Sequence, residues 1–187
     1  MPEVAADPVV RGARLAVDVG SVRVGVAVSD PDGLVATPVA TLARGAVRDG
    51  ARAGDLLRLV EEVRERGAAV VYVGLPRHLS GVEGAAAAAA RAYAGTLAQA
   101  IAPVPVRLVD ERMTTVAAHR ALTASGRAGR KHREVVDQAA AVVILQDALD
   151  AERATGRRSG ERVEADPYRG ALGGPQEDTT TCGETHR

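Results

Sequence analysis

The sequence has almost no aromatic residues: Phe and Trp are absent, and Tyr72, Tyr93 and Tyr168 are its three tyrosines. Apolar residues nevertheless make up 46% of the chain, so its core must be built from Val, Leu, Ile and Ala. Small side chains of this kind suit closely packed helices and buried strands. The length of 187 residues fits one domain with tails rather than two full domains.

The single cysteine, Cys182, excludes a disulfide framework and a cysteine-based metal site. The sequence has no run of 18 apolar residues and no basic-then-apolar signal pattern at its N-terminus, so we expect a cytoplasmic protein without a membrane span. The formal net charge is zero, which argues against binding of nucleic acid through overall charge. A local basic patch is still compatible with that balance.

Composition divides the chain into one domain between two tails. Residues 1–12 are interrupted by Pro and Gly and predict a flexible N-terminal tail. Residues 151–187 have almost no apolar periodicity and predict a disordered C-terminal tail, because they bury too little surface to offset the entropy of ordering. Residues 13–150 are the expected domain.

The apolar pattern between the tails predicts elements in the order βββαβαβαα. Five strands are expected, at 15–18, 22–28, 34–42, 69–73 and 104–109. The first three are expected to form an antiparallel meander, and the last two to be covered on both faces. Helices are expected at 51–66, 83–101, 115–124 and 134–150. The predicted fold is α/β, with a mixed five-stranded sheet and helices on both faces.

Asp18 ends the first predicted strand, in the segment DVGSVRVGVAVSD. A carboxylate at a strand end can bind a metal, and a glycine such as Gly20 lets a phosphate backbone approach closely. Arg23, on the following strand, is a candidate phosphate contact. An ordinary β-turn contains the same Asp and Gly pair, so this segment by itself leaves both interpretations open.

A second acidic position follows another buried strand, where Asp110 and Glu111 precede Arg112, Met113, Thr114 and Thr115. Adjacent carboxylates repel each other unless a cation shares them. Capping of the next helix by one of the threonines, with the acids near its positive end, would also explain the pattern. Strand alternation sends the two acids to opposite faces, so we favour Glu111 as the metal ligand and Asp110 as a supporting residue.

Asp137 shares a predicted helix face with Ala140, Ala141 and Ile144, which lie three, four and seven positions further on. A lone ionised carboxylate on that apolar face would cost several kcal/mol unless it were paired or bound to metal. The alternatives are an ion pair with a nearby Arg and a favourable charge in the first helical turn.

A basic loop is predicted just before that helix, over residues 126–133. Its cations, together with Arg112 after the buried strand, are candidate phosphate contacts: Arg127, Arg130, Lys131 and Arg133. A solvated linker is the alternative interpretation. The turn at residues 74–76 is expected to shape the floor of the site, or to be an ordinary strand-to-helix connection.

Four segments together resemble the YqgF/RuvX family, which has an RNase H-like fold. They are residues 18–30, VYVGLPRHLSG at 71–81, VDERMTT at 109–115 and VDQAAAVVILQDAL at 136–149, and they occur in family order. The resemblance implies that Asp18, Glu111 and Asp137 are catalytic, metal-binding carboxylates with Mg²⁺ or Mn²⁺ as cofactor. Gly20, Asp110, Thr114 and Thr115 would support them.

The resemblance also implies a nucleic-acid substrate and a monomer or homodimer. Maturation of the 5′ end of the 16S rRNA precursor is the expected role, with Holliday junction resolution as the alternative. The family pattern has a small polar residue at the position of His78, and it does not need the tail after residue 150. A non-catalytic nucleic-acid-binding module is a further alternative. An actin-like kinase would need a second copy of the domain, for which this chain has no room.

Overall fold

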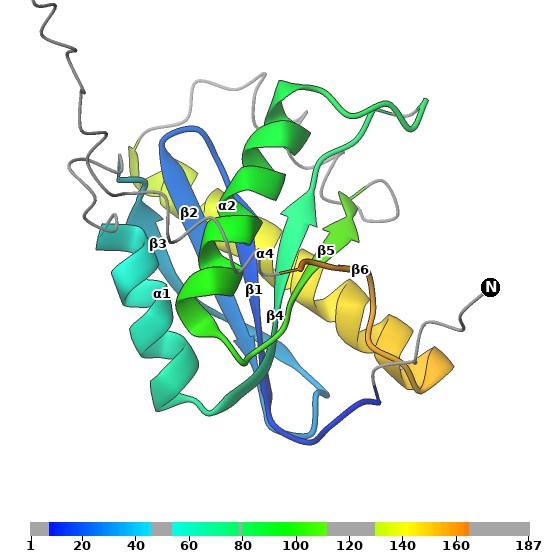
Figure 1. Ribbon diagram of the computed structural model, residues 1–187. Helices are drawn as coiled ribbons and strands as arrows, with labels where there is room; N and C mark the ends of the chain where they lie inside the picture. Colours follow the sequence, from blue (N-terminus) through cyan, green and yellow to red (C-terminus); the bar gives the residue numbers. More distant parts are fainter. Residues whose placement is uncertain (1–7, 46–53, 79, 112–129, 165–187) are drawn as a thin grey trace, which may run out of the picture.

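The computed structural model describes residues 8–45, 54–78, 80–111 and 130–164, with the side chains of residues 130–137 outside that description. These residues form one mixed β-sheet between two layers of helices (Figure 1). The strands are β1 (Ala13–Val19), β2 (Arg23–Ser29), β3 (Ala36–Ala43), β4 (Ala68–Leu75), β5 (Val106–Asp110) and β6 (Glu161–Arg162). The helices are α1 (Gly54–Glu65), α2 (Ala85–Ile101) and α4 (Arg130–Thr155).

The strand order in the sheet is β3-β2-β1-β4-β5-β6. Strands β1, β2 and β3 pair antiparallel, whereas β4 and β5 run parallel to β1. The predicted meander followed by helix-connected parallel strands is therefore confirmed. Pro38 lies on the edge strand β3, where its missing N–H removes no hydrogen bond from the interior of the sheet.

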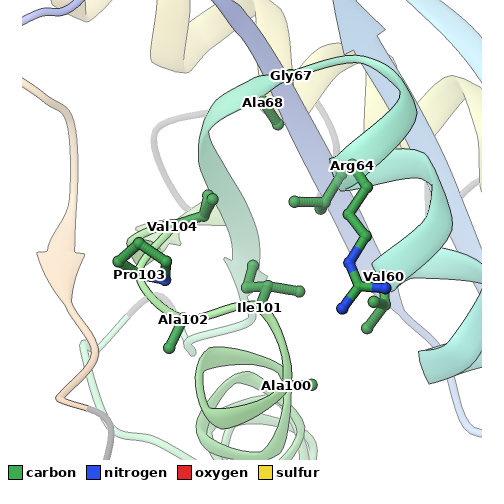
Figure 2. A pocket seen from close by; sticks show the side chains of 10 residues that line it. Val60, Arg64, Gly67, Ala68, Ala100, Ile101, Ala102, Pro103 and Val104 are labelled. Atoms are coloured by element: carbon green, nitrogen blue, oxygen red, sulfur yellow. The ribbon is translucent and has the colours of Figure 1, made fainter.

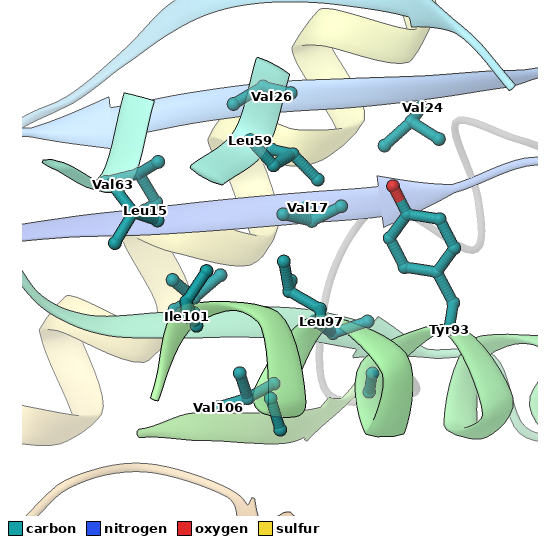
Figure 3. Close-up of a cluster of buried hydrophobic side chains, with 14 of the residues drawn as sticks. Leu15, Val17, Val24, Val26, Leu59, Val63, Tyr93, Leu97, Ile101 and Val106 are labelled. Carbon is teal, nitrogen blue, oxygen red and sulfur yellow. The ribbon is translucent and has the colours of Figure 1, made fainter. Parts of the chain in front are cut away.

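Helices cover both faces of the sheet, as predicted. Helices α1 and α2 pack on one face and α4 crosses the other (Figure 1). Alternation along β1 sends Leu15 and Val17 toward α1 and α2, while Ala16 packs against α4. Figure 3 shows Leu15 and Val17 among the side chains from α1 and α2. Within the described part of the chain, no helix is both long and apolar enough to cross a bilayer.

The prediction of five strands is wrong, and the prediction of disorder from residue 151 is wrong for residues 151–164. Helix α4 continues to Thr155, and the following chain adds β6 to the edge of the sheet, antiparallel to β5. At the other end, Pro8 forms a bridge with Arg157, so residues 8–12 also join the described structure. The helix predicted at 115–124 and the rest of both tails lie outside the described residues.

A buried charged cluster explains why this segment is ordered without apolar periodicity. The Glu152 carboxylate accepts hydrogen bonds from Arg14 Nε at 3.1 Å, from Arg158 Nη1 at 2.7 Å and from the Tyr72 hydroxyl. Residues Arg14, Glu152 and Arg158 are each less than 10% exposed, and Tyr72 is fully buried. Arg14 also donates to the carbonyl oxygens of Gly12 and Pro31. The cluster fastens the C-terminal end of α4 to β1 and β4.

Replacement of Glu152 by Gln should lower the free energy of unfolding by about 3–5 kcal/mol, because two guanidinium groups would remain buried without their counter-charge. Urea denaturation followed by circular dichroism measures this change. Asp150→Asn is the matched control, since the Asp150–Arg153 pair on the same helix is about half exposed and should contribute at most about 1 kcal/mol. Equal effects of the two substitutions would contradict a stabilising role for the buried cluster.

Candidate active site

Three neighbouring parallel strands end at one edge of the sheet with the residues Asp18, Gly74 and Glu111. Asp18 is the penultimate residue of β1, Gly74 that of β4, and Glu111 directly follows β5. In open α/β sheets the carboxyl ends of parallel strands are where binding sites form. The topology therefore brings two segments that are more than 90 positions apart in the sequence to the same edge.

The same three residues also share one face of the sheet. Each follows by two positions a residue that packs against α4, and these preceding residues are Ala16, Tyr72 and Val109. Because successive strand side chains point to opposite faces, residues two positions apart point the same way. The carboxylates of Asp18 and Glu111 consequently lie on the α4 face of the sheet.

Gly74 creates the space that Glu111 occupies. A Cβ atom at position 74 would lie 2.3 Å from Glu111 Oε1 and 2.7 Å from Ile144 Cδ1. The Glu111 carboxylate thus extends over β4, one strand spacing of about 4.8 Å from β1, which carries Asp18. Glu111 is 3% exposed and Asp18 is 5% exposed. Two buried carboxylates therefore share a narrow region of the sheet surface, as the proposed metal site requires.

Asp110 lies on the other face, with Val106 and Leu108, so the predicted separation of the two adjacent acids is confirmed. Its carboxylate pairs with Arg77 Nη1 at 3.4 Å. Arg77 also donates to Glu83 Oε1 at 2.7 Å. The arrangement supports Glu111 as the acid on the α4 face and gives Asp110 a role in holding the loop after β4.

Arg77 was not singled out by the sequence, although it lies within the segment at 71–81. It begins a chain of ion pairs that continues from Glu83 to Arg91 on α2 and from Arg91 to Glu161 on β6. Hydrogen bonds from Arg91, and then from Arg77, lower the pKa of Glu83 to about 2. This chain of ion pairs connects the loop after β4 to α2 and to β6. The loop lies beside the acidic edge, the end of the sheet that carries Asp18, Gly74 and Glu111.

Burial is the main influence on the pKa of Glu111. Loss of solvation, and secondarily the negative charge of Asp110, raise the pKa of Glu111 to about 7. Carboxylate oxygens are the ligands that Mg²⁺ and Mn²⁺ prefer, and a cation between Glu111 and Asp18 would offset the cost of ionising this group. The donor chemistry of these two residues therefore fits a divalent cation.

The proposed third ligand, Asp137, belongs to α4, and its side chain lies outside the described residues. Among the side chains that the structure does describe, no three or more of His, Cys, Asp and Glu are grouped to hold a metal ion. Position 137 is two helical turns before Ile144, which lies over Gly74, and helical spacing places both on the same face. The C-terminal end of α4 contacts Arg14 at the start of β1, so its N-terminal end points toward the edge that carries Asp18.

The predicted basic loop at 126–133 is corrected in part, because α4 begins at Arg130 and not near Glu134. Arg and Lys are good helix formers, so the basic run extends the helix. The side chains of Arg130, Lys131 and Arg133 are not described. Four other predicted site residues lie outside the described residues altogether: Arg112, Thr114, Thr115 and Arg127.

Gly20 and Arg23 form the turn that follows Asp18. Gly20 N donates to Arg23 O at 2.9 Å, and a Cβ at position 20 would lie 2.8 Å from the same carbonyl oxygen. This close approach explains why a glycine stands two residues after Asp18. The side chain of Arg23 is partly exposed at the start of β2, beside the acidic edge.

A pocket of about 330 Å³ lies at the opposite edge of the sheet, between the C-terminal ends of α1 and α2 (Figure 2). Ala68, Ile101, Pro103 and Arg64 are among the residues that line it (Figure 2). None of the predicted site residues lines this pocket. The acidic edge, and not this pocket, carries the chemistry that the sequence predicted.

Gly74→Ala should destabilise the protein by about 1–3 kcal/mol, because the added methyl group would overlap Glu111 and Ile144. Gly95→Ala in α2 is the matched control: apart from the nearby backbone of its own helix, no atom lies within 4 Å of its Cβ position, and it should stabilise the helix by about 0.5–1 kcal/mol. Chemical denaturation measures both values. Stabilisation by both substitutions would show that position 74 tolerates a side chain.

Glu111→Gln should change how stability depends on pH. The folded-state pKa of Glu111 is about 7, above its ordinary value of 4.5, so the wild-type protein loses stability as the pH rises through this interval. Gln cannot ionise. Between pH 4.5 and pH 8 the variant should gain up to about 3 kcal/mol relative to the wild type, measured by urea denaturation in EDTA. Parallel stability curves for the two proteins would mean that Glu111 is not buried as described.

Comparison with known proteins assigns the chain to a family. The family model described as RuvX, Holliday junction resolvase, matches residues 12–151. A Nocardioides protein named "Putative pre-16S rRNA nuclease" is 59% identical over 155 residues, covering 82% of this chain and 97% of that protein. A Streptomyces coelicolor protein of the same name is 56% identical over 154 residues, covering 82% of this chain and 89% of that protein.

A solved structure of Thermus thermophilus RuvC in complex with a Holliday junction substrate aligns with a TM-score of 0.42 and 17% identity, covering 79% of this chain and 99% of that chain. Likeness at this level gives no information about substrate. The family model matches the part of the chain that holds Asp18, Gly74, Glu111 and position 137. The chain therefore belongs to the RuvX family.

Proposed function

We propose that this protein is a metal-dependent endonuclease that cleaves phosphodiester bonds in precursor 16S rRNA. The observation that carries the proposal is the pair of buried carboxylates, Asp18 and Glu111, on one face of the sheet with Gly74 leaving room between their strands. The names of the Nocardioides and Streptomyces relatives support the substrate. Their sequences are similar over most of the described domain.

Asp18, Glu111 and Asp137 would hold Mg²⁺ or Mn²⁺. Bound divalent cations lower the pKa of an attacking water and stabilise the leaving oxygen. Asp18 is supplied by β1, in the middle of the sheet, and Glu111 reaches toward it over β4. Without a cation, burial makes Glu111 take up a proton near neutral pH, so the site binds metal in competition with protons. No His, Ser or Cys nucleophile is needed.

Substrate binding would depend on the phosphate backbone rather than on bases. Arg23 lies beside the acidic edge, and the basic residues at the start of α4 are placed on the helix that approaches the same edge. The basic residues at the start of α4 are Arg130, Lys131 and Arg133. Arg112 and Arg127 are further candidates. Contacts of this kind release counterions, so affinity should fall steeply with salt. We place this activity in the cytoplasm, in a monomer or homodimer.

Cleavage of branched DNA is the second candidate function, favoured by the description of the family model as a Holliday junction resolvase. Symmetric resolution of a four-way junction needs two active sites, so this function would require a dimer. A nucleic-acid-binding module without activity is the remaining alternative. It differs from both nucleases because it shows no metal-dependent cleavage.

The proposal is tested by incubating the purified protein with a precursor 16S 5′-leader RNA and with a four-way DNA junction, each in Mg²⁺, Mn²⁺ or EDTA. We expect cleavage of the RNA with either metal and none in EDTA. Asp18→Asn should reduce the rate more than about 100-fold, because loss of residues that merely support metal ligands already costs about 10–100-fold. Asp150→Asn, on the exposed side of α4, is the control and should cleave normally.

Cleavage of the junction but not the RNA would replace the first candidate by the second. Cleavage that persists in EDTA, or in Asp18→Asn, would contradict the assignment of the acidic edge. RNA binding without cleavage under every condition would favour the inactive binding module.

A further inference from the structure

Arg44 connects the end of β3 to the turn that follows Asp18. Its backbone N–H donates to Val22 O at 2.9 Å, and its Nη1 donates to Gly20 O at 2.8 Å. The ladder between β1 and β2 ends with the pair Val19 and Val24. The guanidinium of Arg44 therefore holds the backbone immediately beyond the last ladder pair.

Arg44 contacts α2, and α1 holds its neighbours. Its guanidinium lies over the ring of Tyr93 on α2, 5.8 Å from the ring centroid. The Tyr93 hydroxyl donates to Asp55 Oδ2 at 2.9 Å, and the Gly45 N–H donates to Asp55 Oδ1 at 3.1 Å. Asp55 is 3% exposed and Tyr93 is 7% exposed, so both supporting side chains are buried. Figure 3 shows the Tyr93 ring beside Val17 and Val24, at the end of β1 that carries Asp18.

This support lies on the face of the sheet opposite to the acidic residues. Tyr93 packs in the core between the sheet and α1 and α2, whereas Asp18 and Glu111 lie on the α4 face. Arg44 can therefore influence Asp18 through the backbone of the turn. The N–H of Gly20 is already hydrogen-bonded to Arg23 O. The hydrogen bond from Arg44 to the carbonyl oxygen of Gly20 therefore fixes the other backbone polar group of the same residue.

We propose that Arg44 is a positioning residue, which locks the turn after Asp18 and thereby fixes the direction of the Asp18 carboxylate for metal binding. The inference rests on the proposed function, since it concerns how the metal ligand is held. It predicts that loss of Arg44 weakens metal binding more than it weakens substrate binding. A cation that contacted phosphate would show the reverse.

The test uses the full chain and Mn²⁺ itself, titrated without RNA and followed by the electron paramagnetic resonance signal of free Mn²⁺. Arg44→Gln should raise the dissociation constant for Mn²⁺ about 10–100-fold, the usual effect of losing a group behind a metal ligand. Arg44→Lys should recover part of the affinity, because it keeps a donor and a cation over Tyr93. The KM for RNA should change less than about threefold, since phosphate contacts are untouched.

Arg66→Gln is the matched control. Arg66 donates to the buried carboxylate of Glu62 at 2.7 Å after the C-terminal end of α1, near the opposite edge of the sheet. The substitution Arg66→Gln also removes an arginine bonded to a buried acid, but the Mn²⁺ affinity should stay unchanged. Gly20→Ala is a second variant that disturbs the same turn from its other side through Arg23 O, and it should also weaken Mn²⁺ binding.

Wild-type Mn²⁺ affinity in Arg44→Gln would overturn the inference, whatever the result for Gly20→Ala, as would a rise in the RNA KM alone. An equal loss of Mn²⁺ affinity in Arg66→Gln would also overturn it, since general destabilisation would then explain the effect. A wild-type chain that neither binds Mn²⁺ nor cleaves RNA would instead refute the proposed function, and the inference with it.

Discussion

The acidic edge depends on the close approach of the Glu111 carboxylate to the backbone of Gly74. Any side chain at position 74 would occupy the space of Glu111 Oε1. With that space open, a glutamate that follows β5 reaches across β4 toward β1, and its charge comes to lie near that of Asp18 under the cover of α4. Burial then raises the pKa of Glu111 to about 7, so the site is costly to ionise until a cation is shared. The absence of a side chain at position 74 thus allows Glu111 to lie buried near Asp18, and this burial raises the pKa of Glu111.

Helix α4 completes this arrangement because it is fixed at its far end. Glu152 is bonded to Arg14, Arg158 and Tyr72, which belong to three different parts of the fold. These bonds set the rotation of the helix about its axis, and Ala141 and Ile144 then face the sheet. The same rotation decides the face on which position 137 lies. In a core with little aromatic surface, ion pairs and hydrogen bonds therefore help to orient helix α4.

Much of the fold was predictable because the apolar periodicity is clear. The β-meander, the two continuous apolar strands and the helices on both faces all follow from local pattern. The boundary at residue 150 was not predictable in this way. Glu152 and Arg158 are charged, and composition assigns charged residues to solvent. Both are buried here because Glu152 pairs with Arg158 and with Arg14, which is 138 positions away in the sequence.

The sequence by itself determined the candidate acids, the separation of Asp110 from Glu111 by strand alternation, and the requirement for glycine near Asp18. These properties depend on neighbours along the chain. The tertiary structure decided that Glu111 lies over Gly74, that Arg77 pairs with Asp110, and that Arg44 holds Gly20 from the opposite face. Each of these contacts joins residues from different elements, and their geometry is set by strand order and helix packing, which local sequence does not encode.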